Sequence, residues 1–227
     1  MTRALAVVLL AVPAVGCSMG QFQTARTLPV GTMRSSTAVY VAANELLEVR
    51  GFHPMGNIQY QVEFRAGVHE RVDVGLQWFG LSGAKMDAKV NVMPPDHDFA
   101  LAFQTGFGGA RDLDDADAYF LHLPINLLAS YRLPHDISPY VGFGYGFYWI
   151  MNRKLSVPAP EDELPRDGWG DGVLRATVGF EFAIDELVAL LVEYDFMTQV
   201  VDDRGDHFAF VDTHLAGLAV QFTWSVL

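Results

Sequence analysis

The sequence predicts an all-β fold, a single antiparallel up-and-down β-barrel of ten strands, with eight strands as the alternative count. Two patterns predict it. From residue 57 onward, apolar residues recur at every second position, which is the period of a strand with one apolar and one polar face. The links between these segments are mostly short and long in alternation, as in a barrel with tight turns at one rim and loops at the other.

The expected strands differ in how clearly they alternate. Ile58 to Val68 has an apolar residue at every even position, and Val141 to Trp149 sets large apolar residues against three alternating glycines. The first strand is less regular, and it is expected because such barrels have an even number of strands. The full set is 35–43, 58–68, 72–78, 85–92, 99–107, 119–132, 141–149, 174–182, 190–196 and 217–224.

The first residues have the layout of a secretory signal peptide. Arg3 is basic, residues 4–12 are apolar and residues 14–16 are small. Cys17 follows as the only cysteine, so no internal disulfide can form. Residues 14–17 resemble the lipobox of bacterial lipoproteins, which implies acylation of Cys17; cleavage after Gly16 with a free Cys17 is the alternative. We expect a signal peptide at 1–16, a lipid-anchored or periplasmic lead-in at 17–34 beneath the barrel, and the barrel at 35–227.

Charge and motif content exclude several classes of protein. The chain has 27 acidic and 15 basic residues and a formal net charge of −12, which does not suit binding to nucleic acid. The sequence has neither a cysteine and histidine cluster for zinc nor a strand followed by a glycine-rich loop and a helix for a nucleotide. We therefore expect no nucleic-acid partner and no cofactor.

Two features favour a membrane around the apolar faces. After residue 16 no segment approaches the roughly 18 consecutive apolar residues of a membrane helix, so any membrane-spanning structure must be built from strands. Large aromatic residues lie near strand ends on the apolar face, as in interfacial girdles. They are Tyr60, Trp78, Phe107, Tyr119, Tyr131, Trp149, Phe182, Tyr194 and Trp224. A lipid-anchored soluble barrel of the lipocalin kind, with its apolar face inward, is the alternative.

The last strand carries a more specific signal. Residues 217–224 alternate and end in Trp224, which resembles the C-terminal signal of bacterial outer-membrane barrels, although residues 225–227 follow it. By its pattern the mature chain resembles the small bacterial outer-membrane β-barrel superfamily, of the OmpA-like and OmpW-like kind. This resemblance implies a transmembrane barrel in the outer membrane of a Gram-negative bacterium. It also implies contact with outer-membrane lipid and lipopolysaccharide, and insertion by the barrel-assembly machinery.

The polar face of the strands predicts a lumen with nearly balanced charge. Enclosed charges must pair or stay hydrated, so the lumen is either an ion-paired filling with a structural role or a narrow, porin-like pore. The expected lumen-lining residues are Glu63, Arg65, Asp73, Lys85, Asp87, Lys89, Arg132, Arg175, Glu181, Glu193 and Asp195.

The long loops are acidic and supply a second candidate site. Their carboxylates are candidate ligands for Ca²⁺ or Mg²⁺ shared with lipopolysaccharide phosphates, namely Asp112, Asp114, Asp115, Asp202 and Asp203. Surface adhesion or ligand binding through these loops is the alternative function. His122 and His214 have no serine beside them in a recognisable signature, so we expect no catalytic residues and no enzyme.

Overall fold

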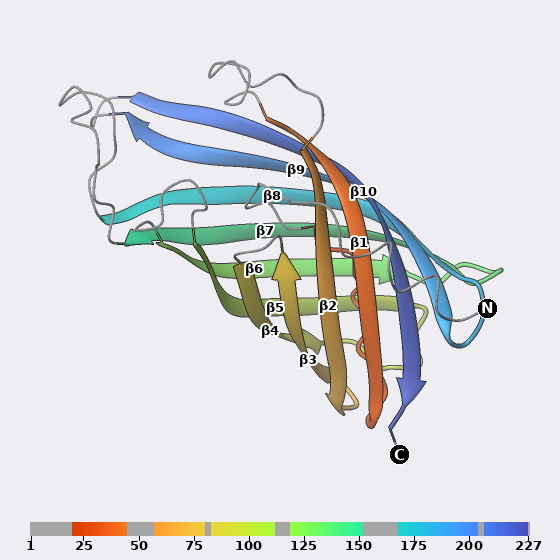
Figure 1. Ribbon diagram of the computed structural model, residues 1–227. Helices are drawn as coiled ribbons and strands as arrows, with labels where there is room; N and C mark the ends of the chain where they lie inside the picture. The colour runs from red at the N-terminus through yellow and green to blue at the C-terminus, as the bar shows by residue number, and fades with distance from the viewer. Residues whose placement is uncertain are drawn as a thin grey trace, which may run out of the picture.

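The protein is a closed barrel of ten antiparallel strands (Figure 1). The computed structural model describes residues 20–44, 57–79, 83–111, 119–151, 168–203 and 207–226. The strands are β1 (Thr32–Asn44), β2 (Asn57–His69), β3 (Val72–Phe79), β4 (Gly83–Asn91), β5 (Phe99–Arg111), β6 (Tyr119–Tyr131), β7 (Ile137–Met151), β8 (Gly168–Ala183), β9 (Val188–Asp203) and β10 (His207–Ser225). The predicted fold class and strand count are confirmed. Among the described residues, no helix is long and apolar enough to cross a membrane.

The first and last strands pair along the whole of β1. Thr32 lies opposite Ser225, and Asn44 lies opposite Thr213. Each other strand pairs with its neighbours in sequence, so the ten described strands have no free edge. Closure matters in hydrocarbon because main-chain N–H and C=O groups find no water there and must bond within the sheet.

Side chains alternate between the two sides of the wall as the sequence predicts. On β5, Phe103 is 53% exposed on the outside, whereas Ala102 and Gln104 are buried inside. On β7, Val141 and Phe143 likewise point outward and are more than half exposed. The lipocalin-like alternative is wrong because it needs the apolar face inside, and here that face is outside.

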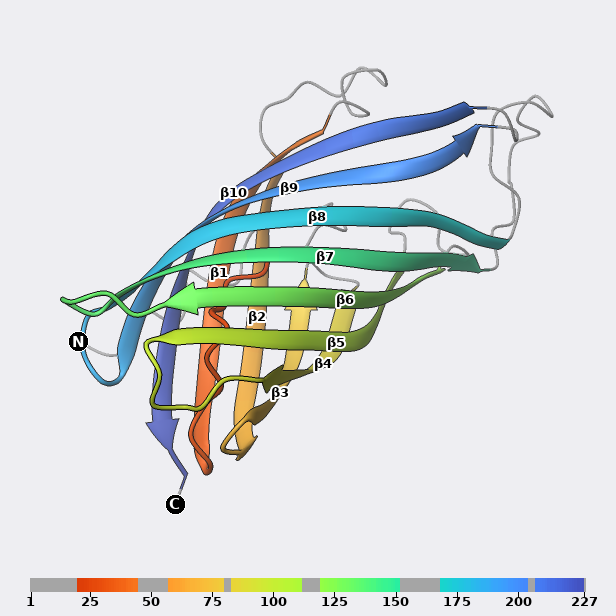
Figure 2. The same ribbon diagram turned by 180° about the vertical axis from the view of Figure 1, so that it is seen from behind.

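The barrel wall is uneven in height. β3 and β4 have 8 and 9 residues, whereas β8, β9 and β10 have 16, 16 and 19. Figure 2 shows the long strands rising past the short ones on the loop side. The link between β3 and β4 is also short, at three residues, so the wall is lowest at these two strands.

The chain before β1 lies inside the barrel rather than beneath it. The side chains of residues 21–25 are between 0% and 3% exposed, and the segment appears as the red coil beside β1 in Figure 2. We call residues 20–31 the plug. The expected position of residues 17–34 beneath the barrel is therefore wrong for the described part, and the wall begins at Thr32 rather than at residue 35. The reason is that the polar lumen supplies partners for the plug's main chain.

Candidate functional site

Arg65 on β2 is the centre of an ion cluster on one wall of the lumen. Its guanidinium donates to Glu63 at 2.7 Å, to Asp73 at 2.9 Å and to Asp87. The carbonyl oxygen of the Gln23 side chain, in the plug, accepts a fourth bond at 2.8 Å. The side chain of Arg65 is 4% exposed, so these bonds replace the hydration that the cation loses on burial.

A second ion cluster lies across the lumen on β7, β8 and β9. Arg175 pairs with Asp195 at 2.8 Å and with Glu193 at 3.7 Å. The Tyr140 hydroxyl donates to Glu193 at 2.8 Å, and the Thr177 hydroxyl donates to Asp195. The two clusters hold opposite walls, and the plug lies between them.

The plug's main chain bonds to both clusters. The consecutive N–H groups of Gln21 and Phe22 each donate to the Glu193 carboxylate at 2.5 Å. Phe22 has a φ of 40°, a left-handed conformation that is uncommon outside glycine. Adjacent N–H groups that converge through such a turn form a concave donor site for an anion, and here the anion is a wall carboxylate.

Lys89 and Asp73 hold the part of the plug that is nearer to the turn side. The Lys89 ammonium donates to the carbonyl oxygens of Thr24 at 2.9 Å and Arg26 at 2.7 Å. It also pairs with Asp73 at 3.4 Å, and Asp73 accepts the N–H of Leu28 at 3.2 Å. A buried lysine can hold a main chain in this way because its ammonium has three donors and no acceptor.

Two plug side chains fill apolar sites in the wall. The Phe22 ring lies 6.2 Å from that of Tyr40, within a buried cluster that includes Leu191 and Leu215. A Cβ at Gly217 would lie 2.6 Å from this ring, so glycine is needed there. Ala25, fully buried, packs in a second cluster with Ala100, Ala102 and Leu128.

The plug passes close to the wall at the turn end of β2. A Cβ at Gly67 would lie 2.1 Å from the carbonyl oxygen of Pro29, and the N–H of Gly31 donates to the Gly67 carbonyl at 3.2 Å. Arg26 donates to the carbonyl oxygens of His97 and Asp98 at the neighbouring turn. These contacts fix the end of the plug that lies at the turn-side rim of the lumen.

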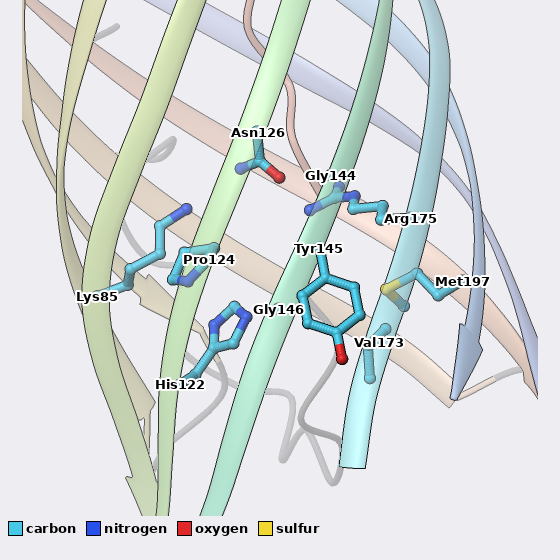
Figure 3. Close-up of a pocket in the computed structure, with 10 residues that line it drawn as sticks. All are labelled: Lys85, His122, Pro124, Asn126, Gly144, Tyr145, Gly146, Val173, Arg175 and Met197. Atoms are coloured by element: carbon cyan, nitrogen blue, oxygen red, sulfur yellow. The ribbon is translucent and has the colours of Figure 1, made fainter. Parts of the chain in front are cut away.

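On the loop side of the plug the lumen retains a cavity (Figure 3). Lys85, Asn126 and Arg175 extend into it from different strands, and His122 and Tyr145 line it toward the loops. The space in it that water can occupy is about 30 Å³, room for one or two water molecules. The lumen is therefore filled by the plug in its turn-side half and keeps a small, polar-lined space above it.

Most of the expected lumen residues are on the inner wall. Glu63, Asp73, Asp87, Glu193, Asp195, Arg65, Lys85 and Lys89 are buried there, and Arg175 is partly buried. Glu181 is also partly buried and pairs with Arg34 at 3.6 Å. Arg132 does not line the lumen. It is exposed, because β6 ends one residue before it, at Tyr131.

The other expected sites fall elsewhere. Cys17 and the loop residues Asp112, Asp114 and Asp115 lie outside the described residues, as do the side chains of Asp202 and Asp203 at the end of β9. No group of metal-ligating side chains occurs within the described part of the chain. His214 lies on the outer wall, where its Nδ1 is 2.6 Å from the Tyr194 hydroxyl.

The sequence reasoning missed the plug and the glutamines that contact it. Gln77, Gln104 and Gln221 face inward, are 1% exposed and bond to plug atoms. Their signal was present, because uncharged amides recur at inward positions of β3, β5 and β10. An amide both donates and accepts, which suits a lumen that holds a main chain.

The barrel identifies a class of protein, and the comparisons with known proteins agree with it. Residues 55–222 match the outer membrane protein beta-barrel domain family, and the chain belongs to this family. It is a protein of the outer membrane. No curated relative matches the sequence.

The chain is similar to solved outer-membrane proteins at low sequence identity. The chain is similar to an outer-membrane channel from Pseudomonas putida F1, with a TM-score of 0.50, 9% identity, and coverage of 92% of this chain and 100% of that one. It is also similar to the Escherichia coli outer membrane protease OmpT, with a TM-score of 0.43, 9% identity, and coverage of 86% and 94%. Neisserial surface protein A matches with a TM-score of 0.40, 11% identity, and coverage of 84% and 95%. At such identities the likeness concerns the fold alone.

Proposed function

We propose that this protein is a structural outer-membrane barrel that its own N-terminal segment closes, and that becomes a narrow pore when this segment leaves. One observation carries the proposal: residues 21–25 are fully buried between the Arg65 and Glu193 clusters. Ten strands enclose more space than the side-chain-filled eight-stranded barrel and much less than a sixteen-stranded porin, so one extended segment is enough to fill the cross-section.

The test is single-channel recording in planar bilayers. Wild-type protein should give no conductance steps. Ala25→Trp should give small, reproducible steps, because Ala25 has no exposed surface and a tryptophan cannot fit against Ala100, Ala102 and Leu128. The control is Val30→Trp, since Val30 is 53% exposed at the edge of the same segment; it should stay silent.

Two results would count against the proposal. Wild-type steps as large as those of Ala25→Trp would show that the plug does not close the lumen. If neither the wild type nor Ala25→Trp gives conductance steps although both are folded, the pore proposal is wrong and only the structural role is left. Folding is checked by the faster migration of unboiled barrel in SDS gels.

The proposal extends to the N-terminus and the loops. Acylation of Cys17 would add an anchor of about 0.8 kcal/mol per buried methylene; labelled palmitate should enter the wild type and not Cys17→Ser. Binding of Ca²⁺ or Mg²⁺ with lipopolysaccharide by the acidic loops should give heat in a calorimetric titration, and its absence would remove this part. Adhesion through the same loops is the second candidate.

A further inference from the structure

The wall of the lumen holds the plug mainly through main-chain atoms. Wall carboxylates accept N–H groups from Gln21, Phe22 and Leu28. Wall side chains also donate to four plug carbonyl oxygens. Gln77 donates to Gly20, and Gln221 donates to Phe22. Lys89 donates to both Thr24 and Arg26. The contacts thus continue from one end of the buried stretch to the other.

Such contacts do not depend on the sequence of the segment. Every residue has a main-chain carbonyl, and every residue except proline has an N–H. Proteins that bind extended peptides of varied sequence take their affinity from main-chain bonds and their selectivity from a few side-chain pockets. The wall supplies both acceptors and donors along the whole segment, including the turn at Phe22, so it has the features of a peptide-binding site.

Two plug side chains fill apolar sites of restricted shape. The Phe22 side chain is 1% exposed against Tyr40 and Gly217, and Ala25 is fully buried among Ala100, Ala102 and Leu128. The first site takes a flat ring because Gly217 leaves space for it, and the second takes only a small side chain. Between them, Gln23 and Thr24 are also buried, at 3% and 2% exposed, and the Gln23 side chain accepts a hydrogen bond from Arg65 at 2.8 Å.

We infer that the lumen is a binding site for peptide segments, in which the plug is the ligand that the chain supplies to itself. The ligand class is a peptide with an aromatic residue, a hydrogen-bond-accepting side chain directly after it, as at Gln23, and a small side chain three positions after the aromatic residue. This inference rests on the proposed function, since a second peptide can bind only when the plug has left.

The experiment uses the full chain with its plug displaced. The Ala25→Trp protein, folded in detergent, is titrated against a peptide of residues 20–31 labelled with fluorescein after Gly31, and binding is followed by anisotropy. Ala25→Trp should bind the peptide. Wild-type protein should bind it at least about tenfold more weakly, because its own plug competes at a high effective concentration.

Matched peptides separate main-chain from side-chain recognition. A peptide in which Thr24 and Val30 exchange places, with Gln21, Phe22, Gln23 and Ala25 kept, should bind within about threefold of the original, because valine and threonine are similar in size and Val30 is exposed. A peptide N-methylated at Phe22 keeps every side chain and loses the N–H that Glu193 accepts, so it should bind at least about tenfold more weakly. Phe22→Ala in the peptide should weaken binding to a similar extent.

The outcomes are distinguishable from those of the proposed function. If the exchanged peptide loses as much affinity as the N-methylated one, side chains are read and the inference is wrong. If Ala25→Trp conducts but binds no peptide, the inference is wrong, and the proposed function of the plug in closing the lumen still holds. If it neither conducts nor binds, both are wrong. Should Ala25→Trp not migrate as a folded barrel, Phe22→Asp opens the lumen by placing a charge in the aromatic site, and the same readings apply.

Discussion

The Glu193 carboxylate accepts the main-chain N–H of Phe22 at 2.5 Å, although 171 residues separate the two in sequence. Its other oxygen accepts the N–H of Gln21. Charge-assisted bonds of this kind are about twice as strong as neutral ones. One side chain of β9 thereby fixes the deeper end of the plug.

Glu193→Gln should lower the free energy of unfolding by about 2 to 3 kcal/mol. The amide keeps the size of the side chain, but it loses the charge and places a donor where a second acceptor is needed. The measurement is the urea midpoint of heat-modifiable migration. Glu186→Gln, on the exposed turn between β8 and β9, should leave the midpoint unchanged, and an equal midpoint for both variants would contradict the role of Glu193.

Arg65→Met should be more damaging, with a loss above about 3 kcal/mol, because three buried carboxylates lose their shared cation. Arg65→Lys should recover part of the loss, since an ammonium cannot reproduce the planar set of donors. Arg71→Met, at an exposed turn, is the control. Normal stability of Arg65→Met would show that the cluster is not needed to hold the wall.

Phe22→Ala should loosen the plug without unfolding the barrel. Removing a buried phenylalanine side chain costs about 3 to 5 kcal/mol, and the loss falls on the seating of the plug because Phe22 is not part of the wall. A reporter cysteine in place of buried Ala102, in a Cys17→Ser chain, should react with a water-soluble maleimide at least about tenfold faster. Val30→Ala should have no such effect, and equal labelling rates would refute the prediction.

Gly67→Ala should displace the plug at the turn-side rim of the lumen. The added Cβ would lie 2.1 Å from the Pro29 carbonyl oxygen, and a main-chain atom cannot move aside without moving the segment. The same maleimide reporter should react faster, while the barrel still migrates as folded. Val68→Ala, one residue away with an exposed side chain, should match the wild type; a silent Gly67→Ala would mean that the plug tolerates a wider path.

Phe143→Arg should test the medium around the outer wall. Phe143 is 61% exposed, and an arginine facing the bilayer midplane costs about 2 to 4 kcal/mol in a transmembrane barrel. Folding into lipid vesicles should lose this stability, measured by urea titration. Glu70→Arg, exposed at a turn, should fold like the wild type, and an unchanged Phe143→Arg would place this face outside hydrocarbon.

The wall of the barrel was predictable because each side faces one medium. On β7, for example, Val141 and Phe143 alternate with small residues. Because the side-chain period is two, all the large apolar residues of such a strand must lie on the same face of the wall. Arg132 shows the limit of this reasoning. Its parity is inward, but parity carries no information once the strand has ended.

The plug was not predictable in the same way. Gln21, Gln23 and Thr24 resemble a solvated leader by composition, and the contacts that bury the segment involve main-chain atoms, which no side-chain pattern records. Besides the inward glutamines, Gly67 and Gly217 were available indications, since each leaves space for a neighbour. Neither glycine reveals that the neighbour comes from the N-terminal segment.

The position of Phe22 has a consequence for how the cylinder holds shut. Its ring touches Tyr40 on the first strand, and its carbonyl accepts a bond from Gln221 on the last. Phe22 therefore contacts both strands of the seam from the inside of the barrel. Opening the seam breaks these contacts together with the β1–β10 pairing, whereas departure of the plug leaves that pairing in place, so an occupied lumen adds to the resistance of the closed wall without being required for it.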